Sequence, residues 1–316
     1  MPNLVITGAS GFIGVNLLRR IHADPAFDRF DRLVLIDPLQ YGIQKIPAEI
    51  LHDERVLFEQ ASIYSPAVVA RLIRGGDVVI HLAAEVNTAA RPQDGVADDP
   101  VGYLRALADA GIARLLFMSS ADLYGVNNSD DLLESDAVAP TTIYSAAKAA
   151  FEAYLSAFAA SHGLPVVVFR PVTVYGPQQE PGWLVPVAIT RALAREPVTI
   201  IGDGTTRRDW IHVDDVCELL TLATLLPGTD VHGQTFNVGT GHEWTVLELV
   251  RHILTETGRP TGDIDFAPGR RGDPPRQITT AAKARTMFGW APTIGLADGL
   301  NATIAAYRQL AQDRGE

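Results

Sequence analysis

Short apolar runs alternate with amphipathic stretches through the first half of the chain. Each run is too short for a helix and too continuous for a half-exposed strand, so it predicts a strand buried on both faces of a parallel sheet. The runs lie at 4–6, 33–36, 56–59, 78–80, 114–118 and 166–169. The intervening stretches predict helices over 15–23, 66–74, 100–110 and 144–161. Six strand–helix repeats with short connections predict right-handed crossovers and a doubly wound parallel α/β sheet.

The pattern loosens after Arg170-Pro171 into elements separated by proline and glycine. Here we expect helices at 183–195 and 246–257, a strand at 198–201, a charged strand at 207–215 that leads into a helix, and two closing helices. This mixture predicts a smaller mixed α/β lobe beside the larger domain. We expect the larger domain to span 1–169, with 208–237 returning to it, and the lobe to span 170–207 and 238–316.

Composition and charge narrow the class of protein. The 316 residues are 47% apolar, and the net charge of −11 with a pI near 5.2 argues against nonspecific binding to nucleic acid or to an anionic membrane. Cys217 is the single cysteine, so we expect no intrachain disulfide, no cysteine zinc site and no bound metal. The N-terminus lacks a basic segment followed by an apolar run, and we expect a soluble cytoplasmic protein.

A glycine-rich turn follows the first apolar run directly. Gly8 and Gly11 would let the backbone approach a pyrophosphate at a helix N-terminus, and Gly14 would let that helix pack closely on the strand. A plain tight turn is the alternative, but the strand–turn–helix context favours dinucleotide binding in a Rossmann fold. Asp37, 23 residues after Gly14, ends the second run. Its carboxylate would accept hydrogen bonds from ribose hydroxyls and repel a 2′-phosphate, which favours NAD over NADP.

Tyr144 and Lys148 form a candidate acid/base pair, because a four-residue spacing puts both side chains on one face of a helix. Lys148 is one of three lysines in a chain otherwise rich in arginine, which suggests a chemical need for an amine. We expect burial beside this cation to lower the pKa of Tyr144. Ser120 follows the fifth strand at the carboxyl edge of the sheet, where ligands bind; capping of a turn or helix is its alternative role.

Over nearly its whole length the chain resembles the extended short-chain dehydrogenase/reductase family, in its group of NAD-dependent nucleotide-sugar epimerases, dehydratases and decarboxylases. The motifs that carry the resemblance are Gly8-Ala9-Ser10-Gly11-Phe12-Ile13-Gly14, His81-Leu82-Ala83-Ala84, Ser119-Ser120-Ala121-Asp122-Leu123-Tyr124-Gly125, Tyr144-x-x-x-Lys148, Arg170-Pro171-Val172-Thr173-Val174-Tyr175-Gly176-Pro177, Arg208-Asp209-Trp210-Ile211-His212-Val213-Asp214-Asp215 and Asn237-Val238-Gly239. The resemblance implies that 1–169 binds NAD and that the lobe binds a UDP- or dTDP-linked sugar.

What the resemblance implies for chemistry is a transient oxidation at C4 of the sugar. Tyr144 would take the proton of the C4 hydroxyl, Lys148 would hold the nicotinamide ribose, and Ser120 would hydrogen-bond the reacting oxygen. Asp122 is the fourth catalytic residue that the resemblance implies. Besides Tyr144 and Lys148, the implied cofactor contacts are Gly8, Ser10, Gly11, Phe12, Ile13, Gly14, Asp37, Ser62, Ile63, Leu82, Ala83, Ala84 and Val172. The implied substrate contacts are Glu85, Asp122, Thr173, Arg208, Arg270, Asp273 and Arg276.

The two residues after Ser120 bear on the outcome of the reaction. Family dehydratases carry an Asp-Glu pair there, whereas this chain has Ala121 and Asp122, which disfavours dehydration. A UDP-sugar 4-epimerase is the leading expectation, because family epimerases tolerate a small residue at the first position. A UDP-glucuronate decarboxylase, in which Asp122 and Arg276 serve the substrate, is the alternative.

The chain differs from the family pattern at two further places, and other functions and an oligomeric state also follow as expectations. Ser62 stands where the family often has an aspartate for the adenine amine, and the 85–99 region is shorter than usual. A catalytically silent NAD-binding regulatory protein and a simple reductase for non-sugar carbonyls are further alternatives. The helix at 144–161 resembles one that family members pair into an intersubunit bundle, so we expect a homodimer.

Overall fold

A computed structural model of the protein describes residues 1–39, 42–83, 99–127, 131–269 and 272–314. The chain divides into two compact units. The first comprises Met1–Leu123, Ile143–Arg170 and Cys217–Phe236, and the second comprises Tyr124–Thr142, Pro171–Val216 and Asn237–Glu316.

A seven-stranded sheet forms the centre of the first unit, with strand order β3-β2-β1-β4-β5-β6-β10. Its strands are β1 (Leu4–Thr7), β2 (Leu33–Ile36), β3 (Val56–Glu59), β4 (Val78–His81), β5 (Arg114–Met118), β6 (Val166–Pro171) and β10 (Gln234–Val238). Every pair from β3 to β6 is parallel. The order reverses between β1 and β4, so the predicted doubly wound α/β fold is confirmed, with its topological switch point at the ends of these two strands.

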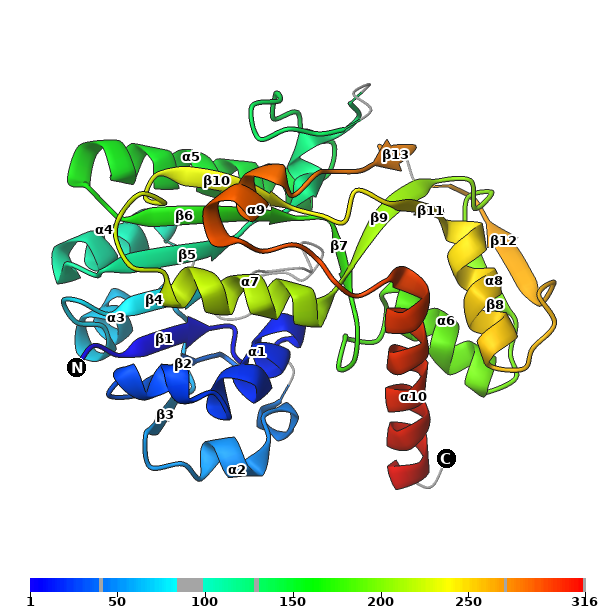
Figure 1. Cartoon of the computed structure of the whole chain (residues 1–316), viewed down its shortest axis with the longest axis horizontal. Coiled ribbons are helices and arrows are strands. Elements are labelled where there is room, and N and C mark those ends of the chain that lie inside the picture. The colour runs from blue at the N-terminus through cyan, green and yellow to red at the C-terminus, as the bar shows by residue number, and fades with distance from the viewer. Residues whose placement is uncertain (40–41, 84–98, 128–130, 270–271, 315–316) are drawn as a thin grey trace. The chain divides into compact units, whose positions relative to one another are not determined.

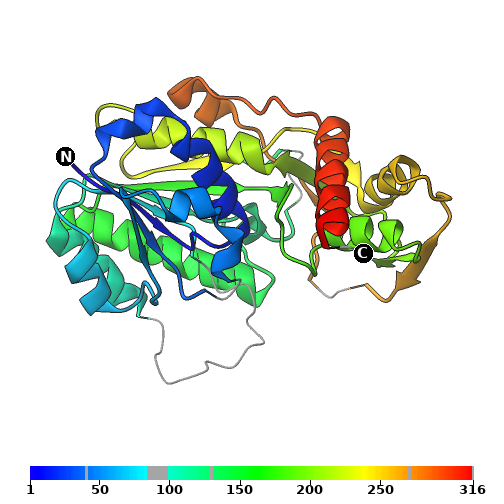
Figure 2. The ribbon, with the colours of Figure 1, turned by 90° about the horizontal axis from the view of Figure 1, so that it is seen from below.

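Helices cover both faces of this sheet (Figures 1 and 2). They are α1 (Phe12–His22), α2 (Ala48–Leu51), α3 (Pro66–Leu72), α4 (Pro100–Ala110), α5 (Ile143–His162) and α7 (Val213–Leu225), with short 3-10 turns at Pro25–Arg29, Ile43–Lys45 and Ala121–Tyr124. α3, α4 and α5 pack side by side on one face. α1 and α7 lie on the other face, where Arg20 and Glu218 approach to 3.7 Å.

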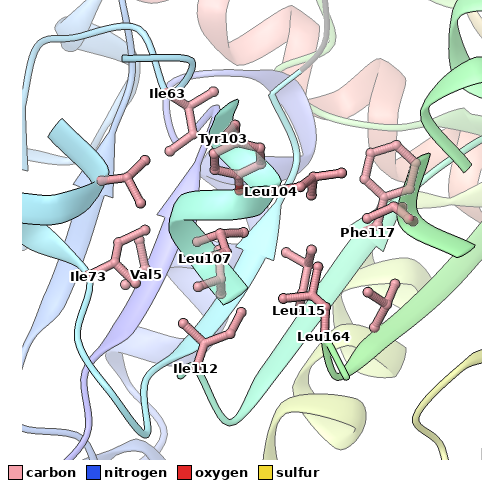
Figure 3. Close-up of a cluster of buried hydrophobic side chains, with 14 of the residues drawn as sticks. Val5, Ile63, Ile73, Tyr103, Leu104, Leu107, Ile112, Leu115, Phe117 and Leu164 are labelled. Atoms are coloured by element: carbon pink, nitrogen blue, oxygen red, sulfur yellow. The ribbon is translucent and has the colours of Figure 1, made fainter. Parts of the chain in front are cut away.

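The core of the first unit lies between the sheet and the layer of α3, α4 and α5. Figure 3 shows side chains from β1, α4 and β5 meeting there, among them Val5, Leu107 and Leu115, each fully buried. Burial of this kind stabilises the fold by roughly 1.5–3 kcal/mol for each large aliphatic side chain. The uninterrupted apolar runs of the sequence are therefore explained by strands that are covered from both sides.

The second unit contains two smaller sheets. In the four-stranded sheet, β9 (Arg207–His212) pairs with β7 (Thr173–Tyr175), β11 (Glu243–Thr245) and β13 (Arg276–Gln277). In the other sheet, β8 (Val198–Ile201) pairs with β12 (Ile264–Ala267). The remaining helices of this unit are α6 (Leu184–Leu193), α8 (Val246–Glu256), α9 (Ala282–Phe288) and α10 (Leu296–Arg314). A second core joins α6, α8 and α10 to these strands.

The strand pairing of β9 changes one predicted boundary. The segment 208–237 was expected to return as a whole to the larger domain, but β9 belongs by its pairing to the second unit. The return begins at Cys217, within α7. In the described part of the chain, no helix is long and apolar enough to cross a membrane.

Arg114 joins β5 to the end of α7 through a buried guanidinium. Its two terminal nitrogens donate to the carbonyl oxygens of Ala223 (2.6 Å), Leu226 (2.9 Å) and Gly228 (2.6 Å). These carbonyls include the unsatisfied acceptors of a helix C-terminus, where a cation is also favoured by the helix dipole. Burial lowers the pKa of the Arg114 guanidinium from its ordinary value.

We predict that Arg114→Ala lowers the free energy of unfolding by about 3 kcal/mol, because it leaves buried carbonyls without donors. Urea unfolding of the purified variant measures this loss. Arg74→Ala, at an exposed position of the same unit, is the control and should change stability by less than about 0.5 kcal/mol. Equal stabilities of the two variants would contradict the role assigned to Arg114.

Candidate active site

The glycine turn between β1 and α1 brings the backbone close to the end of β4. Gly8 has a φ of +72°, and a Cβ at this position would lie 2.7 Å from the Ala83 nitrogen. A Cβ on Gly14 would lie 2.5 Å from the Gly8 carbonyl oxygen, so only glycine allows α1 to approach the strand this closely. The first turn of α1 has no acidic residue and no side-chain cap. Its free N–H groups can therefore receive an anionic group such as a pyrophosphate.

Asp37 fixes the conformation of this turn. Its buried carboxylate accepts hydrogen bonds from the Ser10 N–H (2.9 Å) and the Leu39 N–H (2.7 Å). Each carboxylate oxygen keeps a further lone pair, so acceptance from a ribose hydroxyl is compatible with both bonds. The Ser10 hydroxyl is buried and has no hydrogen-bond partner among the described residues, which leaves it able to bond a ligand at the turn.

The other predicted cofactor contacts follow strand ends of the same sheet. Ser62 and Ile63 come after β3, where the Ser62 hydroxyl accepts the Tyr64 N–H at 3.2 Å. Leu82 and Ala83 come directly after β4, and Ala83 contacts the glycine turn as described. Ala84 lies outside the described residues.

Tyr144 lies in the first turn of α5 and meets the segment that follows β5. Ser120 is hydrogen-bonded to the Tyr144 hydroxyl, and the Asp122 carboxylate is close enough to act on its charge. The Asp122 N–H donates to the Ser120 hydroxyl at 3.1 Å, which holds the 119–122 turn. Ser120, Asp122 and Tyr144 are thus neighbours in one unit.

The expected direction of the Tyr144 pKa was wrong for the chain without ligands. Burial raises the pKa of Tyr144 to about 12, the Asp122 carboxylate adds to the rise, and the hydrogen bond from Ser120 opposes it. The physical reason is that an anionic phenolate loses solvation and faces a like charge. Lys148, expected to lower this pKa, instead donates to the Met118 carbonyl oxygen at 2.7 Å.

Lys148 is fully enclosed beside the fifth strand. Its ammonium lies 5.0 Å from the centre of the Phe117 ring, and burial lowers the pKa of Lys148 to about 8. His81 is buried against the Phe117 and Phe151 rings. Burial and the nearby Lys148 lower the pKa of His81 to about 3, so this imidazole stays neutral.

Glu152 was not among the predicted site residues. It is buried one helical turn after Lys148 and pairs with Arg170 at 2.6 Å. Positions 144, 148 and 152 share one face of α5. This repeated four-residue spacing is the sequence signal from which Glu152 could have been predicted.

Two of the predicted substrate contacts in the second unit are arginines that form ion pairs with carboxylates. Arg208 donates to Asp273 at 2.5 Å, and Arg276 donates to Glu243 at 2.6 Å. Thr173 lies in β7 and pairs with Trp210 of β9. Val172 is buried between β6 and β7. Two further predicted contacts, Glu85 and Arg270, lie outside the described residues.

Comparison with known proteins places this arrangement in a family. The family model described as the NAD dependent epimerase/dehydratase family matches residues 4–239. The chain belongs to this family. The predicted membership of the extended short-chain dehydrogenase/reductase group and the predicted cofactor, NAD, are therefore confirmed. The membership also makes the chain an enzyme of the epimerase/dehydratase type.

Relatives within the family carry different activities. A dTDP-glucose 4,6-dehydratase of Actinoplanes sp. is 33% identical over 318 residues, covering 96% of this chain and 97% of the relative. A UDP-glucose 4-epimerase of Mycolicibacterium smegmatis is 32% identical over 323 residues, covering 98% and 99%. A crystal structure of the Streptomyces venezuelae dTDP-glucose 4,6-dehydratase DesIV, a double mutant with NAD bound, has a TM-score of 0.89 at 29% identity and covers 98% of each chain.

We predict that Gly14→Ala weakens NAD binding by at least about tenfold, because its Cβ pushes the Gly8 carbonyl out of the turn. Isothermal titration with NAD⁺ measures the dissociation constant. Gly262→Ala is the matched control, since its Cβ meets no atom within 4 Å. An unchanged affinity in the Gly14 variant would remove this turn from the cofactor site.

We predict that Asp122→Asn lowers the pKa of Tyr144 from about 12, because the variant removes a like charge from beside the phenolate. The pH titration of ring-labelled tyrosine by carbon-13 NMR measures the change, with the signal assigned by its loss in Tyr144→Phe. Asp109→Asn, at an exposed position of α4, should leave the titration unchanged. No shift in the Asp122 variant would show that its carboxylate is too distant to act.

Proposed function

We propose that the protein is a nucleotide-sugar 4-epimerase that inverts C4 of a UDP-linked hexose through a 4-keto intermediate. The observation that carries the proposal is the group formed by Ser120, Tyr144 and Lys148, together with a buried alanine, Ala121, directly after Ser120. The group can move a proton at a sugar hydroxyl, and the alanine offers no carboxyl for further elimination.

Each residue of this group has a separate task. In its phenolate form, Tyr144 takes the proton of the C4 hydroxyl and returns it to the ketone oxygen after the sugar has turned over. Ser120 donates a hydrogen bond to that oxygen, and Lys148 holds the nicotinamide ribose. The glycine turn and Asp37 would hold NAD⁺, which would supply a reversible acceptor for the C4 hydride. Proton and hydride both come back to the sugar, so the reaction consumes no cofactor.

Overall similarity does not separate epimerase from dehydratase, because relatives of both kinds are almost equally identical to this chain. The side chain at position 121 does bear on the choice. Elimination of water across C5 and C6 needs an acid for the leaving hydroxyl as well as a base for the C5 proton. Ala121 is fully buried and cannot act as that acid. Of the two positions after Ser120, only Asp122 carries a carboxyl group, and we propose that this group contacts the sugar.

A 4,6-dehydratase is the second candidate. The proximity of the Asp122 carboxylate to the Tyr144 hydroxyl favours it, since one carboxylate at this place can remove the C5 proton of a 4-ketosugar. The dehydratase names of several relatives support the same view. Decarboxylation of a UDP-glucuronate has less support, because its expected partner Arg276 is already paired with Glu243.

We propose that the second unit provides the nucleotide contacts. Arg208 has a guanidinium that is only 11% exposed and is paired with Asp273, whose side chain is 48% exposed. A diphosphate offers this guanidinium two acceptors in place of one. The family resemblance supports five further proposed substrate contacts, which are Thr173, Arg270, Asp273, Arg276 and Glu85.

A homodimer built on α5 also remains a proposal. The outer face of this helix carries exposed small residues and Tyr154, which is 41% exposed, so it suits close helix pairing. We also propose a cytoplasmic location. Sedimentation velocity at micromolar protein tests the dimer.

Product analysis on a panel of UDP- and dTDP-sugars tests the proposed function. Unchanged mass with inverted C4 in the NMR spectrum supports the epimerase. Loss of water identifies a dehydratase, and loss of CO₂ identifies a decarboxylase. Absence of turnover on every sugar would overturn the proposal and favour a reductase or a silent NAD-binding protein.

We predict that Tyr144→Phe lowers kcat by about 10³-fold or more, because the variant cannot accept or return the C4 proton. NAD binding should stay within a factor of about two, since the phenol ring is kept. Steady-state kinetics and NAD titration check both statements. Tyr154→Phe, on the outer face of α5, is the control; comparable kcat values for the two variants would exclude Tyr144 as the acid/base.

We predict that Arg208→Ala weakens the binding of UDP by about 10–100-fold, because a charge-assisted hydrogen bond to the diphosphate is lost. Titration calorimetry with UDP measures the dissociation constant. Arg251→Ala, at an exposed position of α8, is the control. Equal affinities for the two variants would place the diphosphate elsewhere.

A further inference from the structure

A buried carboxylate, Glu152, lies on the proposed catalytic face of α5, one turn after Lys148. Both oxygens of Glu152 accept from Arg170, with its Nε at 3.1 and 3.2 Å and a terminal nitrogen at 2.6 Å. The Ser119 hydroxyl donates to Glu152 Oε1 at 2.5 Å. The side chains of Glu152 and Arg170 are 11% and 8% exposed, so this is an interior ion pair and not a surface contact.

The contacts of Glu152 tie together three elements of the first unit. Glu152 belongs to α5, Arg170 lies in β6, and Ser119 directly follows β5. Ser119 is also held through its main chain, since its N–H donates to the Phe169 carbonyl oxygen at 2.7 Å. Ser120 is the next residue, so a bond that fixes Ser119 to α5 also limits the movement of Ser120 against Tyr144.

Glu152 is also the carboxylate on the face of α5 that carries Lys148. The Lys148 ammonium has one protein acceptor in the described contacts, the Met118 carbonyl, and an aromatic ring beneath it. Burial lowers the pKa of Lys148 to about 8, and Glu152 opposes that fall. Among the described residues, His81 from β4 is neutral and lies near Lys148, and Tyr144 precedes Lys148 by one turn of α5. Arg170 from β6 is the cation paired with Glu152.

We propose that Glu152 is a positioning residue for the proposed epimerase chemistry, through its contacts with Ser119 and Arg170 and its charge one helical turn from Lys148. It holds the Ser119-Ser120 turn against α5, and it keeps the Lys148 amine charged in an interior that otherwise disfavours a cation. Arg170 fixes the carboxylate in the orientation that serves both. The proposal rests on the proposed function for its catalytic part, whereas the charge of Lys148 can be measured without any substrate.

The three lysines of the chain make that measurement direct. Protein grown with carbon-13 at lysine Cε gives one signal each for Lys45, Lys148 and Lys283, and Lys148→Met assigns the buried one. We expect the Lys148 signal to titrate at a pH about 1 unit lower in Glu152→Gln than in the natural protein, because an opposite charge is removed. Ser119→Ala keeps the carboxylate, and its Lys148 signal should titrate within about 0.3 units of the natural protein.

Two further variants guard against simple loss of folding. Glu152→Gln leaves the Arg170 cation buried without its partner, so the double variant Glu152→Gln with Arg170→Met removes both charges and should fold. Its Lys148 midpoint should also lie below that of the natural protein, but by less than in Glu152→Gln, because the Arg170 cation is removed as well. Glu54→Gln, at an exposed position of the same unit, should leave the midpoint unchanged. An unchanged midpoint in the folded Glu152 variants would overturn the proposal.

Kinetics test the positioning part of the proposal. Glu152→Gln and Ser119→Ala should each lower kcat by about tenfold or more, with KM changed by less than about threefold, since neither residue touches the substrate. A kcat equal to that of the natural protein in both variants would also overturn the proposal. If the natural protein turns over no sugar while the Lys148 midpoint shifts as expected, the proposed function fails and the charge effect of Glu152 stands.

Discussion

The site depends on a cation held in an apolar interior. Lys148 sits between a strand end and an aromatic ring, where its amine loses the solvation of water. Such a group stays charged only with fixed partners, and those partners must be supplied by the surrounding elements. The end of β5, the end of β6 and one face of α5 therefore have to meet in a single arrangement. The sheet order places β5 beside β6, and Ser119 and Arg170 at the ends of these strands both contact Glu152 of α5.

Most of the fold was predictable from the sequence because its signals are local. Continuous apolar runs gave β2, β3 and β5 with their observed bounds, and the glycines between β1 and α1 identified the turn. The assignment of β9 was less accurate, because strand partners are chosen by contacts between distant segments. Its pairing with β7, β11 and β13 cannot be read from its own residues.

The candidate site shows the same limit at the level of single atoms. The helical spacing predicted that Tyr144 and Lys148 share a face, but not that the ammonium turns to the Met118 carbonyl. Nor does a sequence show how much water a phenol loses, or that Asp122 approaches it from another element. These two effects decide the sign of the Tyr144 pKa shift. Glu152, in contrast, lay on the predicted face and was overlooked because its partner Arg170 comes from a distant strand.

The hydrogen bond from the Ser10 N–H to Asp37 has a consequence for redesign of the enzyme. A change of cofactor preference toward a phosphorylated dinucleotide normally begins by replacing the acidic residue that ends the second strand. In this chain the same carboxylate braces the glycine turn through the Ser10 N–H and its own loop through the Leu39 N–H. Its replacement therefore loosens the turn as it relaxes selectivity. A compensating acceptor for the Ser10 N–H has to be designed together with the new preference.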